Sequence, residues 1–434
     1  MMWKSTALPD HGRRALLSVF LALLALGLPP APSALAQDWR DERWTATWGA
    51  GPGGPALPAN TPVFTDQTLR LVVHASIGGA RVRIRLSNEM GTTPLHIGAA
   101  RIALRADGAD IVAGSDRALT FGGKPDIVLA PGAPALSDAV DLDVRPLSDL
   151  AVSLYLPGAS SATTLHGTAS QTSYVSLPGD FTAAPVFPTQ RTLLSWPFLT
   201  EVAVEARGAA IVTLGDSITD GTRSTPDTNN RWPDWLARRL QTIRDPGAGL
   251  NARLGVVNRG ISGNRLLSNA AEGSLAGRGI QERFDRDVLA TSGVRYMTLM
   301  IGINDIGGSP AANPVTAEDL IAGYRQVIAR AHAHGIAVFG ATLTPFEGAG
   351  YYSPAKDAVR RAVNEWIRSG DAFDAVIDFD RVTRDPAHPA RLLPAYDSGD
   401  HLHPGDLGYQ AMGNAVPVEV FRTLKRVQET APVE

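Results

Sequence analysis

The hydrophobic pattern of this chain changes at about residue 208, and that change limits the possible fold more than any other feature. Between about residues 39 and 207, apolar residues such as Val82, Ile84 and Leu86 alternate with polar ones. A period of two is typical of strands that bury one face and leave the other in water. After Gly208, short apolar runs alternate with longer stretches of helical periodicity, which indicates a parallel sheet covered by helices. The 434 residues are therefore predicted to hold an all-β part and an α/β part.

The first part is expected to be a β-sandwich or jelly roll. Glycine (43 residues) and proline (31 residues) are abundant in the chain, and they form turn clusters such as 51–55 and 130–134. No helical run of ten or more residues is evident before residue 207. The arginines that alternate with the apolar residues, Arg81, Arg83 and Arg85, are predicted to form the solvated face of a strand.

The second part is expected to be a three-layer α/β domain with a parallel sheet. Its predicted buried strands are 211–214, 256–257, 297–301, 337–341 and 375–377, and its predicted helices are 232–243, 280–290, 316–334 and 354–368. The helix from 316 is the best marked, because Thr316 and Asp319 form a capping-box start and Gly335 a stop. Sheets of this kind bind their ligands at the C-terminal ends of the strands.

The N-terminus has the pattern of an export signal. Arg13 and Arg14 precede an apolar run at 15–28, and the small residues of 34–36 then offer a cleavage site before Gln37. Fourteen apolar residues are too few to cross a hydrocarbon core of about 30 Å as a helix. The chain is therefore expected to be exported to the periplasm or beyond the cell, by a Sec or a twin-arginine signal. No integral membrane segment is expected after cleavage.

The predicted division of the chain is a signal peptide at 1–36, a β-sandwich domain at 37–207 and an α/β domain at 208–434. The linker is expected at 195–208, with docking of its apolar residues as the alternative. Hydrophobic residues make up 44% of the chain and charged residues 19%, which excludes wholesale disorder. A net charge of −3 indicates neither a nucleic-acid nor an anionic-membrane partner. The absence of cysteine excludes disulfides, thiolate nucleophiles and thiolate metal sites.

A nucleophile and its base are suggested by two distant segments. Ser217 lies in the glycine-rich turn 215–221 (GDSITDG), after the first α/β strand, where a serine hydroxyl is exposed but needs a base. Asp400 and His403 stand three residues apart near the other end of the chain. In a tight turn this spacing lets the carboxylate meet Nδ1 and leaves Nε2 free to accept the serine proton. His401 is a rival base.

The ends of the next two strands carry groups that suit an oxyanion. Residues 258–264 (NRGISGN) follow the second strand, and residues 302–305 (GIND) follow the third. A glycine N–H and an asparagine amide are the donors that stabilise a tetrahedral oxyanion beside a nucleophilic serine.

These four blocks resemble the GDSL (SGNH) hydrolases over about residues 208–425. The family's serine, glycine, asparagine and Asp/His pair fall in the family's order on Ser217, Gly263, Asn304, and Asp400 with His403. In the second block, Gly263 aligns better with the family glycine than Gly260 does. The resemblance implies a flavodoxin-like three-layer sheet and hydrolysis of ester or thioester bonds through an acyl-serine. It also implies that no metal or cofactor is required.

The resemblance assigns a role to each of these residues. Ser217 attacks, His403 acts as general base and then acid, and Asp400 orients His403. The backbone N–H groups of Ser217 and Gly263, with the side chain of Asn304, form the oxyanion hole. The expected substrates are small-molecule or polysaccharide esters, with short acyl groups on carbohydrate favoured. A lysophospholipase, an arylesterase or an acyltransferase on the same site, and a non-catalytic carbohydrate-binding protein, are the alternatives.

Other polar and aromatic residues have simpler expected roles. Asp216 and Asp305 are expected to hold their loops by hydrogen bonds, whereas Asp220 can be an acid or a structural group. His166, in the β part, can reach the site from the neighbouring domain, although a satisfied structural histidine is the commoner case. The histidines expected at the surface are His332 and His334, and the aromatics that can line a pocket are Trp232, Trp235 (more simply core), Tyr351 and Tyr352.

Overall fold

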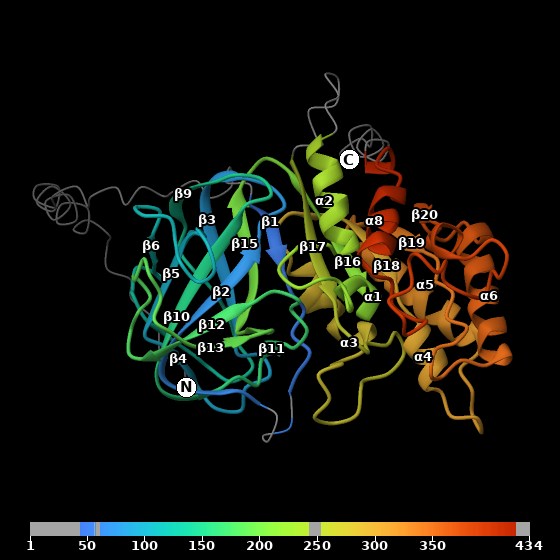
Figure 1. Ribbon diagram of the computed structural model, residues 1–434, viewed down its shortest axis with the longest axis horizontal. Helices are drawn as coiled ribbons and strands as arrows, with labels where there is room; N and C mark the ends of the chain where they lie inside the picture. The colour runs from blue at the N-terminus through green and yellow to red at the C-terminus, as the bar shows by residue number, and fades with distance from the viewer. Residues whose placement is uncertain (1–43, 56, 58–60, 243–252, 422–434) are drawn as a thin grey trace, which may run out of the picture. The chain divides into compact units, whose positions relative to one another are not determined.

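The computed structural model describes residues 44–55, 57, 61–242 and 253–421 (Figure 1). The predicted signal peptide, with its apolar run, lies outside the described residues. Among the helices of the described part, none combines the length and the apolar character needed to cross a membrane.

Two antiparallel sheets form the first part of the chain (Figure 1). The five-stranded sheet contains β1 (Trp44–Gly49), β15 (Leu199–Glu205), β3 (Gly79–Ser87), β8 (Pro134–Leu136) and β9 (Val140–Val144). The six-stranded sheet runs in the order β13 (Thr189–Leu193), β12 (Ser173–Pro178), β2 (Val63–His74), β10 (Asp149–Ser161), β5 (Ala99–Leu104) and β6 (Arg117–Leu119). Two short ladders pair β4 (Leu95–Ile97) with β7 (Ile127–Leu129) and β11 (Leu165–His166) with β14 (Trp196–Pro197).

The inner faces of both sheets share one hydrophobic core. Val82 and Ile84 of β3 pack in the same cluster as Leu71 of β2 and Val152 of β10, and all four are fully buried. Burying the apolar face of each sheet against the other is what holds a sandwich together. The predicted β-sandwich architecture is confirmed.

Two expectations for the β part need correction. The segment 195–208 is not a linker, because it contains β15, which is hydrogen-bonded between β1 and β3. The alternative expectation, that its apolar residues dock, is confirmed. The arginine face of β3 is not freely solvated. Arg81 and Arg85 lie opposite carboxylates of β15. Arg81 Nη1 is 3.5 Å from Glu205 Oε2, and Arg85 Nη2 is 3.3 Å from Glu201 Oε1.

The second part is a parallel five-stranded sheet in the order β17 (Leu254–Gly260), β16 (Ala209–Gly215), β18 (Val294–Met300), β19 (Ala337–Ala341) and β20 (Ala375–Ile377). In chain order this is 2-1-3-4-5, the flavodoxin-like arrangement. Every predicted strand of this part is present and pairs with its neighbours in one parallel sheet. The predicted α/β fold class is therefore confirmed.

Helices surround this sheet (Figure 1). They are α1 (Ser217–Asp220), α2 (Trp232–Thr242), α3 (Ile280–Phe284) with a π-helical continuation at Asp285–Leu289, α4 (Ile303–Gly308), α5 (Ala317–Ala333), α6 (Pro354–Ser369), α7 (Phe379–Thr383) and α8 (Asp406–Ala415). One group packs α2, α7 and α8 together, and another packs α3, α4, α5 and α6. The capping box of Thr316 and Asp319 starts α5 as predicted, and Gly335 follows its end with a left-handed φ of 66°.

The two parts meet along β1, which lies against β16 and β17. Ala46 of β1 packs on Ala210 and Val257, and the Val256 N–H donates to Ser76 Oγ at 2.9 Å. Gly255 has to be small here, because a Cβ would come within 2.2 Å of the Ala46 carbonyl oxygen. The α/β sheet is therefore covered on this side by the β part.

Candidate active site

Ser217 begins a one-turn helix at the C-terminal end of β16. Asp216 caps that helix, with its Oδ1 accepting the Ile218 N–H at 3.1 Å. Gly221, with a φ of 96°, ends the turn in a left-handed conformation that favours glycine. A Cβ on Gly215 would come within 2.6 Å of the Met300 carbonyl oxygen, so the strand-to-helix turn also depends on a missing side chain.

The structure brings the predicted serine, histidine and aspartate together. His403 Nε2 lies 2.8 Å from Ser217 Oγ, and His403 Nδ1 lies 2.8 Å from Asp400 Oδ2. Asp400 Oδ1 accepts the backbone N–H groups of Leu402 and His403 at 3.1 and 2.8 Å, which holds the carboxylate in the turn. This is the geometry in which a carboxylate orients an imidazole toward a serine hydroxyl.

The electrostatics of this turn favour an ionised Asp400. Burial acts to raise the pKa of Asp400, but the hydrogen bonds from the backbone and side chain of His403 outweigh it and hold that pKa below its ordinary value. The rival base, His401, points elsewhere. Its Nδ1 lies 2.6 Å from Asp397 Oδ2, and its side chain is largely exposed.

The predicted oxyanion donors lie on two loops that are tied to each other. The Asn304 side chain donates one N–H to the Asn264 carbonyl at 3.0 Å, which leaves its second N–H for another acceptor. Gly263 adopts a left-handed φ of 78° directly before Asn264. Gly260 instead ends β17, and its N–H is already used by Asn258 Oδ1 at 2.9 Å. Gly263 is thus the better placed of the two glycines.

Asp216 and Asp305 hold their loops by hydrogen bonds, as expected. Asp305 accepts the N–H groups of Leu266 and Leu267, both at 2.9 Å, and so ties α4 to the loop after β17. Burial raises the pKa of Asp216 to about 7, and the nearby Asp305 carboxylate adds to the effect. Burial raises the pKa of Asp305 as well.

Asp220 and His166 form a buried pair that joins the two parts of the chain. His166 Nε2 lies 2.9 Å from Asp220 Oδ1, and both side chains are 4% exposed. Asp220 is thus a structural group, and His166 is a satisfied histidine whose partner lies in the α/β part. Its ring nitrogens face Asp220 and the carbonyls of Gly51 and Thr168 rather than Ser217.

Two residues near the Asp400 turn were not anticipated from the sequence. Arg223 Nε donates to Asp400 Oδ2 at 3.1 Å, and Asp397 accepts from His401. The four-residue spacing of Asp397 and His401 is a signal that sequence reasoning can use. Nothing in the sequence pairs Arg223 with a carboxylate 177 positions away.

The remaining aromatic and histidine residues lie in three surroundings, which are the core, the surface and a small apolar cluster. Trp232 is fully buried in the core with Trp235 packed beside it, and His332 is an exposed partner of Asp374. Tyr351 and Tyr352 instead pack on a small apolar cluster of Ile303, Phe346, Ala349 and Leu402. Across the described ranges, no group of three or more histidine, aspartate or glutamate side chains is placed to hold a metal ion.

Comparison with known proteins identifies a protein family that the α/β part matches. Residues 213–411 match the model of the GDSL-like Lipase/Acylhydrolase family. No curated protein matches the chain. Among solved structures, an alpha/beta hydrolase enzyme (LAE5) from the metagenome of Lake Arreo is 23% identical, with 50% of this chain and 96% of that chain covered and a TM-score of 0.36.

Two further solved structures are similar to this chain, with comparable identity, coverage and TM-score. The acetylxylan esterase Axe2 from Geobacillus stearothermophilus is 22% identical, covering 49% of this chain and 95% of that chain with a TM-score of 0.36. A GDSL-like lipase from Bacteroides thetaiotaomicron VPI-5482 is 19% identical, covering 49% and 88% with a TM-score of 0.34. The family match includes Ser217, Gly263, Asn304, Asp400 and His403. Residues 213–411 are thus a GDSL-like lipase/acylhydrolase domain, that is, an ester hydrolase domain of the GDSL type.

Proposed function

We propose that this protein is an exported serine ester hydrolase that forms an acyl-serine on Ser217 and acts on short acyl esters such as acetylated carbohydrate. The observation that carries the proposal is the hydrogen-bonded chain from Ser217 through His403 to Asp400, with both links at 2.8 Å. A serine hydroxyl becomes an effective nucleophile when a base this close can take its proton.

Acylation then follows from the positions of the three side chains. Ser217 Oγ attacks the ester carbonyl carbon while its proton passes to His403 Nε2, and Asp400 stabilises the resulting imidazolium. The oxyanion is stabilised by the N–H groups of Ser217 and Gly263 and by the free N–H of Asn304. When the tetrahedral intermediate collapses, His403 gives the proton to the leaving alkoxide, and the alcohol departs.

Deacylation uses the same groups in reverse. His403 takes a proton from water as the water oxygen attacks the acyl-serine carbonyl carbon. When the second tetrahedral intermediate collapses, the bond to Ser217 Oγ breaks, His403 returns the proton to Ser217 Oγ, and the carboxylic acid departs. No metal or cofactor is part of the proposed reaction.

The preference for a short acyl group is supported by the apolar cluster beside the site. Ile303 directly precedes Asn304, and Leu402 directly precedes His403. Ile303 belongs to a small buried cluster with Phe346, and Leu402 and Tyr351 pack against that cluster. We propose that these bulky side chains, adjacent in sequence to the oxyanion donor and the base, restrict the space for the acyl group.

A combined labelling and chain-length experiment tests the proposal. A fluorophosphonate probe should label the wild type and fail to label Ser217→Ala, because the probe reacts with the activated hydroxyl. Hydrolysis of p-nitrophenyl esters should be fastest for acetate and fall steadily toward octanoate. Labelling that survives in Ser217→Ala would overturn the assignment of the nucleophile.

The same assay discriminates the alternatives. A preference for long acyl chains, followed by activity on lysophospholipid, would favour a lysophospholipase. Transfer of acetyl to an added sugar in excess of transfer to water would favour an acyltransferase. Release of acetate from acetylated xylan would support the carbohydrate branch, whereas binding without any hydrolysis would indicate a carbohydrate-binding protein.

Export and the division of the chain belong to the same proposal. We infer a signal peptide at 1–36 that is removed before Gln37, a β domain at 37–207 and a hydrolase domain at 208–434. N-terminal sequencing of the protein recovered from outside the cytoplasm should begin near Gln37. A mature protein that keeps Met1 would contradict this inference.

A further inference from the structure

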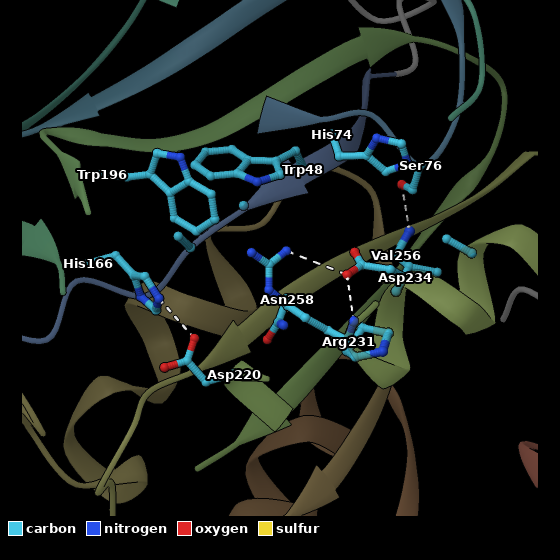
Figure 2. A pocket seen from close by; sticks show the side chains of 14 residues that line it. Trp48, His74, Ser76, His166, Trp196, Asp220, Arg231, Asp234, Val256 and Asn258 are labelled. Atoms are coloured by element: carbon cyan, nitrogen blue, oxygen red, sulfur yellow. Dashed lines mark hydrogen bonds and ion pairs between the residues drawn. The ribbon is translucent and has the colours of Figure 1, made fainter. Parts of the chain in front are cut away.

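A buried histidine of the β part makes contacts that the proposed reaction does not use. His166 lies on β11, which pairs with β14, and its partner in that ladder is Trp196. The ring centroids of His166 and Trp196 are 5.4 Å apart. Figure 2 shows His166 pointing to Asp220 at the edge of a pocket that Trp48 and Trp196 also line.

The hydrogen-bond partners of the His166 ring among the described residues are all acceptors. Nδ1 lies 2.8 Å from the Gly51 carbonyl oxygen, and Nε2 lies 2.9 Å from Asp220 Oδ1 and 3.2 Å from the Thr168 carbonyl oxygen. A neutral imidazole has only one N–H, so only the doubly protonated ring can donate at both nitrogens. Burial by itself would lower the pKa of His166, but the charge of Asp220 and these hydrogen bonds raise it above its ordinary value.

Asp220 also contacts the loop that carries Gly263, the proposed oxyanion glycine. Its Oδ2 accepts the Ser262 N–H at 2.9 Å and the Ser262 hydroxyl at 2.7 Å, and Ser262 directly precedes Gly263. Asp220 is also the last residue of α1, the single turn that begins at Ser217. One carboxylate therefore connects the nucleophile's helix with the loop of the proposed oxyanion glycine.

We propose that His166 of the β part is a positioning residue of the active site, which holds Asp220 as an ion pair and thereby sets the Ser262–Gly263 loop for the oxyanion. The inference rests on the proposed function, because it assigns Gly263 to the oxyanion hole. It gives the β part a role in the hydrolysis itself, distinct from any binding of carbohydrate. His166 touches neither the nucleophile nor the base, so its effect passes through Asp220.

The test is a double-mutant cycle between His166 and Ser262 in the full chain, read out as kcat on p-nitrophenyl acetate. Active enzyme is counted by fluorophosphonate titration, so that loss of folded protein is separated from loss of rate. His166→Ala should lower kcat by about 10- to 100-fold with KM changed less than about 2-fold, because a displaced oxyanion donor acts on the transition state. Ser262→Ala in the His166→Ala background should then add little, because both changes break one chain of contacts.

Two more variants make the result specific. His166→Gln keeps an N–H donor toward Asp220 and should recover at least part of the lost kcat, and it also serves where His166→Ala does not fold. His74→Gln is the matched control, because His74 lines the same cavity but pairs with Asp149, at 2.7 Å, within the β part. The control should leave kcat within about 2-fold of the wild type, since its partner has no contact with the oxyanion loop.

Three outcomes would overturn the inference. The first is a kcat for His166→Ala equal to that of the His74→Gln control. The second is an effect of His166→Ala on KM alone. The third is a double mutant whose loss of kcat equals the product of the losses in the two single mutants. In each case the wild type still hydrolyses the ester and Ser217 is still labelled. A wild type that hydrolyses no ester would instead refute the proposed function.

Discussion

At the scale of single residues, the site depends on a few hydrogen bonds between groups that are far apart in sequence. His403 and Ser217 are 186 positions apart, and Asn304 and Asn264 are 40 apart. Asn304 keeps one amide N–H directed at the Asn264 carbonyl and one that is available for the substrate. Removing the Asn304 side chain should therefore impair the rate more than the stability.

Asn304→Ala should reduce kcat by about 10²- to 10³-fold, because it removes one proposed oxyanion donor. KM for p-nitrophenyl acetate should change little, since the donor acts mainly on the tetrahedral intermediate. Steady-state kinetics check this, with the exposed Asn313→Ala as a matched control. A loss confined to KM would show that Asn304 binds the ground state instead.

Asp216 should make the stability of the protein depend on pH. Its pKa is about 7 in the folded state against an ordinary value of 3.8, and its Oδ2 has no hydrogen-bond partner among the described residues. Between pH 4 and 7 the folded state therefore binds more protons at Asp216 than the unfolded state does. Stability from this group is present at low pH and is lost as the pH rises through that window.

Asp216→Asn removes the titration while it keeps the capping oxygen. The melting temperature of Asp216→Asn minus that of the wild type should increase by on the order of a few degrees between pH 4.5 and pH 8, because only the wild type loses this stability as the pH rises. Asp319→Asn is the control, because hydrogen bonds from Thr316 lower the pKa of Asp319 and its titration therefore lies below this pH range. The melting temperature of Asp319→Asn relative to the wild type should stay nearly constant between pH 4.5 and pH 8. Parallel pH profiles for the wild type and Asp216→Asn would refute the shift.

At the scale of secondary-structure elements, one buried arginine joins the ends of two strands to a helix. Arg283 of α3 donates to the Gly215 carbonyl at 3.0 Å and to the Arg259 carbonyl at 2.8 Å. It also donates to Asn264 Oδ1 at 3.0 Å and pairs with Asp287 at 2.6 Å. The C-terminal ends of β16 and β17 are thereby held in the positions from which the catalytic loops start.

Arg283→Met should destabilise the protein by about 3–5 kcal/mol, because it leaves Asp287 partly uncompensated and takes a donor away from three buried acceptors. Urea unfolding measures the change. The matched control is Arg278→Met, whose 3.4 Å pair with Glu282 is about half exposed. It should stay within about 0.5 kcal/mol. Equal stabilities of the two variants would contradict this role of Arg283.

At the scale of the whole molecule, a buried ion pair joins the β part to the α/β part. Arg259 of β17 is 1% exposed, and its Nη2 lies 3.2 Å from Glu201 Oε2 of β15. Its Nη1 donates to the carbonyls of Ala50 and Thr200 at 2.7 and 2.8 Å. The strand after the nucleophile's helix is thus anchored in the β part, which makes independent unfolding of the two parts unfavourable.

Glu201→Gln should lower the stability of both parts together, by about 3–5 kcal/mol, because the buried Arg259 loses one of its counter-charges and Arg85 loses its carboxylate partner. Calorimetry should show one transition at a lower temperature. Glu205→Gln, which removes a more exposed partner of Arg81 at 3.5 Å, should change stability by less than about 1 kcal/mol. Two separate transitions, with only one displaced, would show that the parts unfold independently.

Local sequence patterns were sufficient to predict the fold class and the strand that each catalytic segment follows. Each predicted buried strand is present, and Ser217, Gly263 and Asn304 follow β16, β17 and β18, because hydrophobic periodicity and turn residues are local signals. The three-residue spacing of Asp400 and His403 also acts locally, since one turn brings their side chains together.

The pairing of buried polar side chains could not be predicted from local patterns and is seen only in the folded chain. The sequence placed 195–208 in a linker and the arginines of β3 in water, but β15 completes a sheet and its glutamates face those arginines. Likewise, nothing local pairs His166 with Asp220 or Glu201 with Arg259. Such pairs form where two separately patterned parts pack together, and the partner of a buried charge depends on that packing rather than on the residues beside it in the chain.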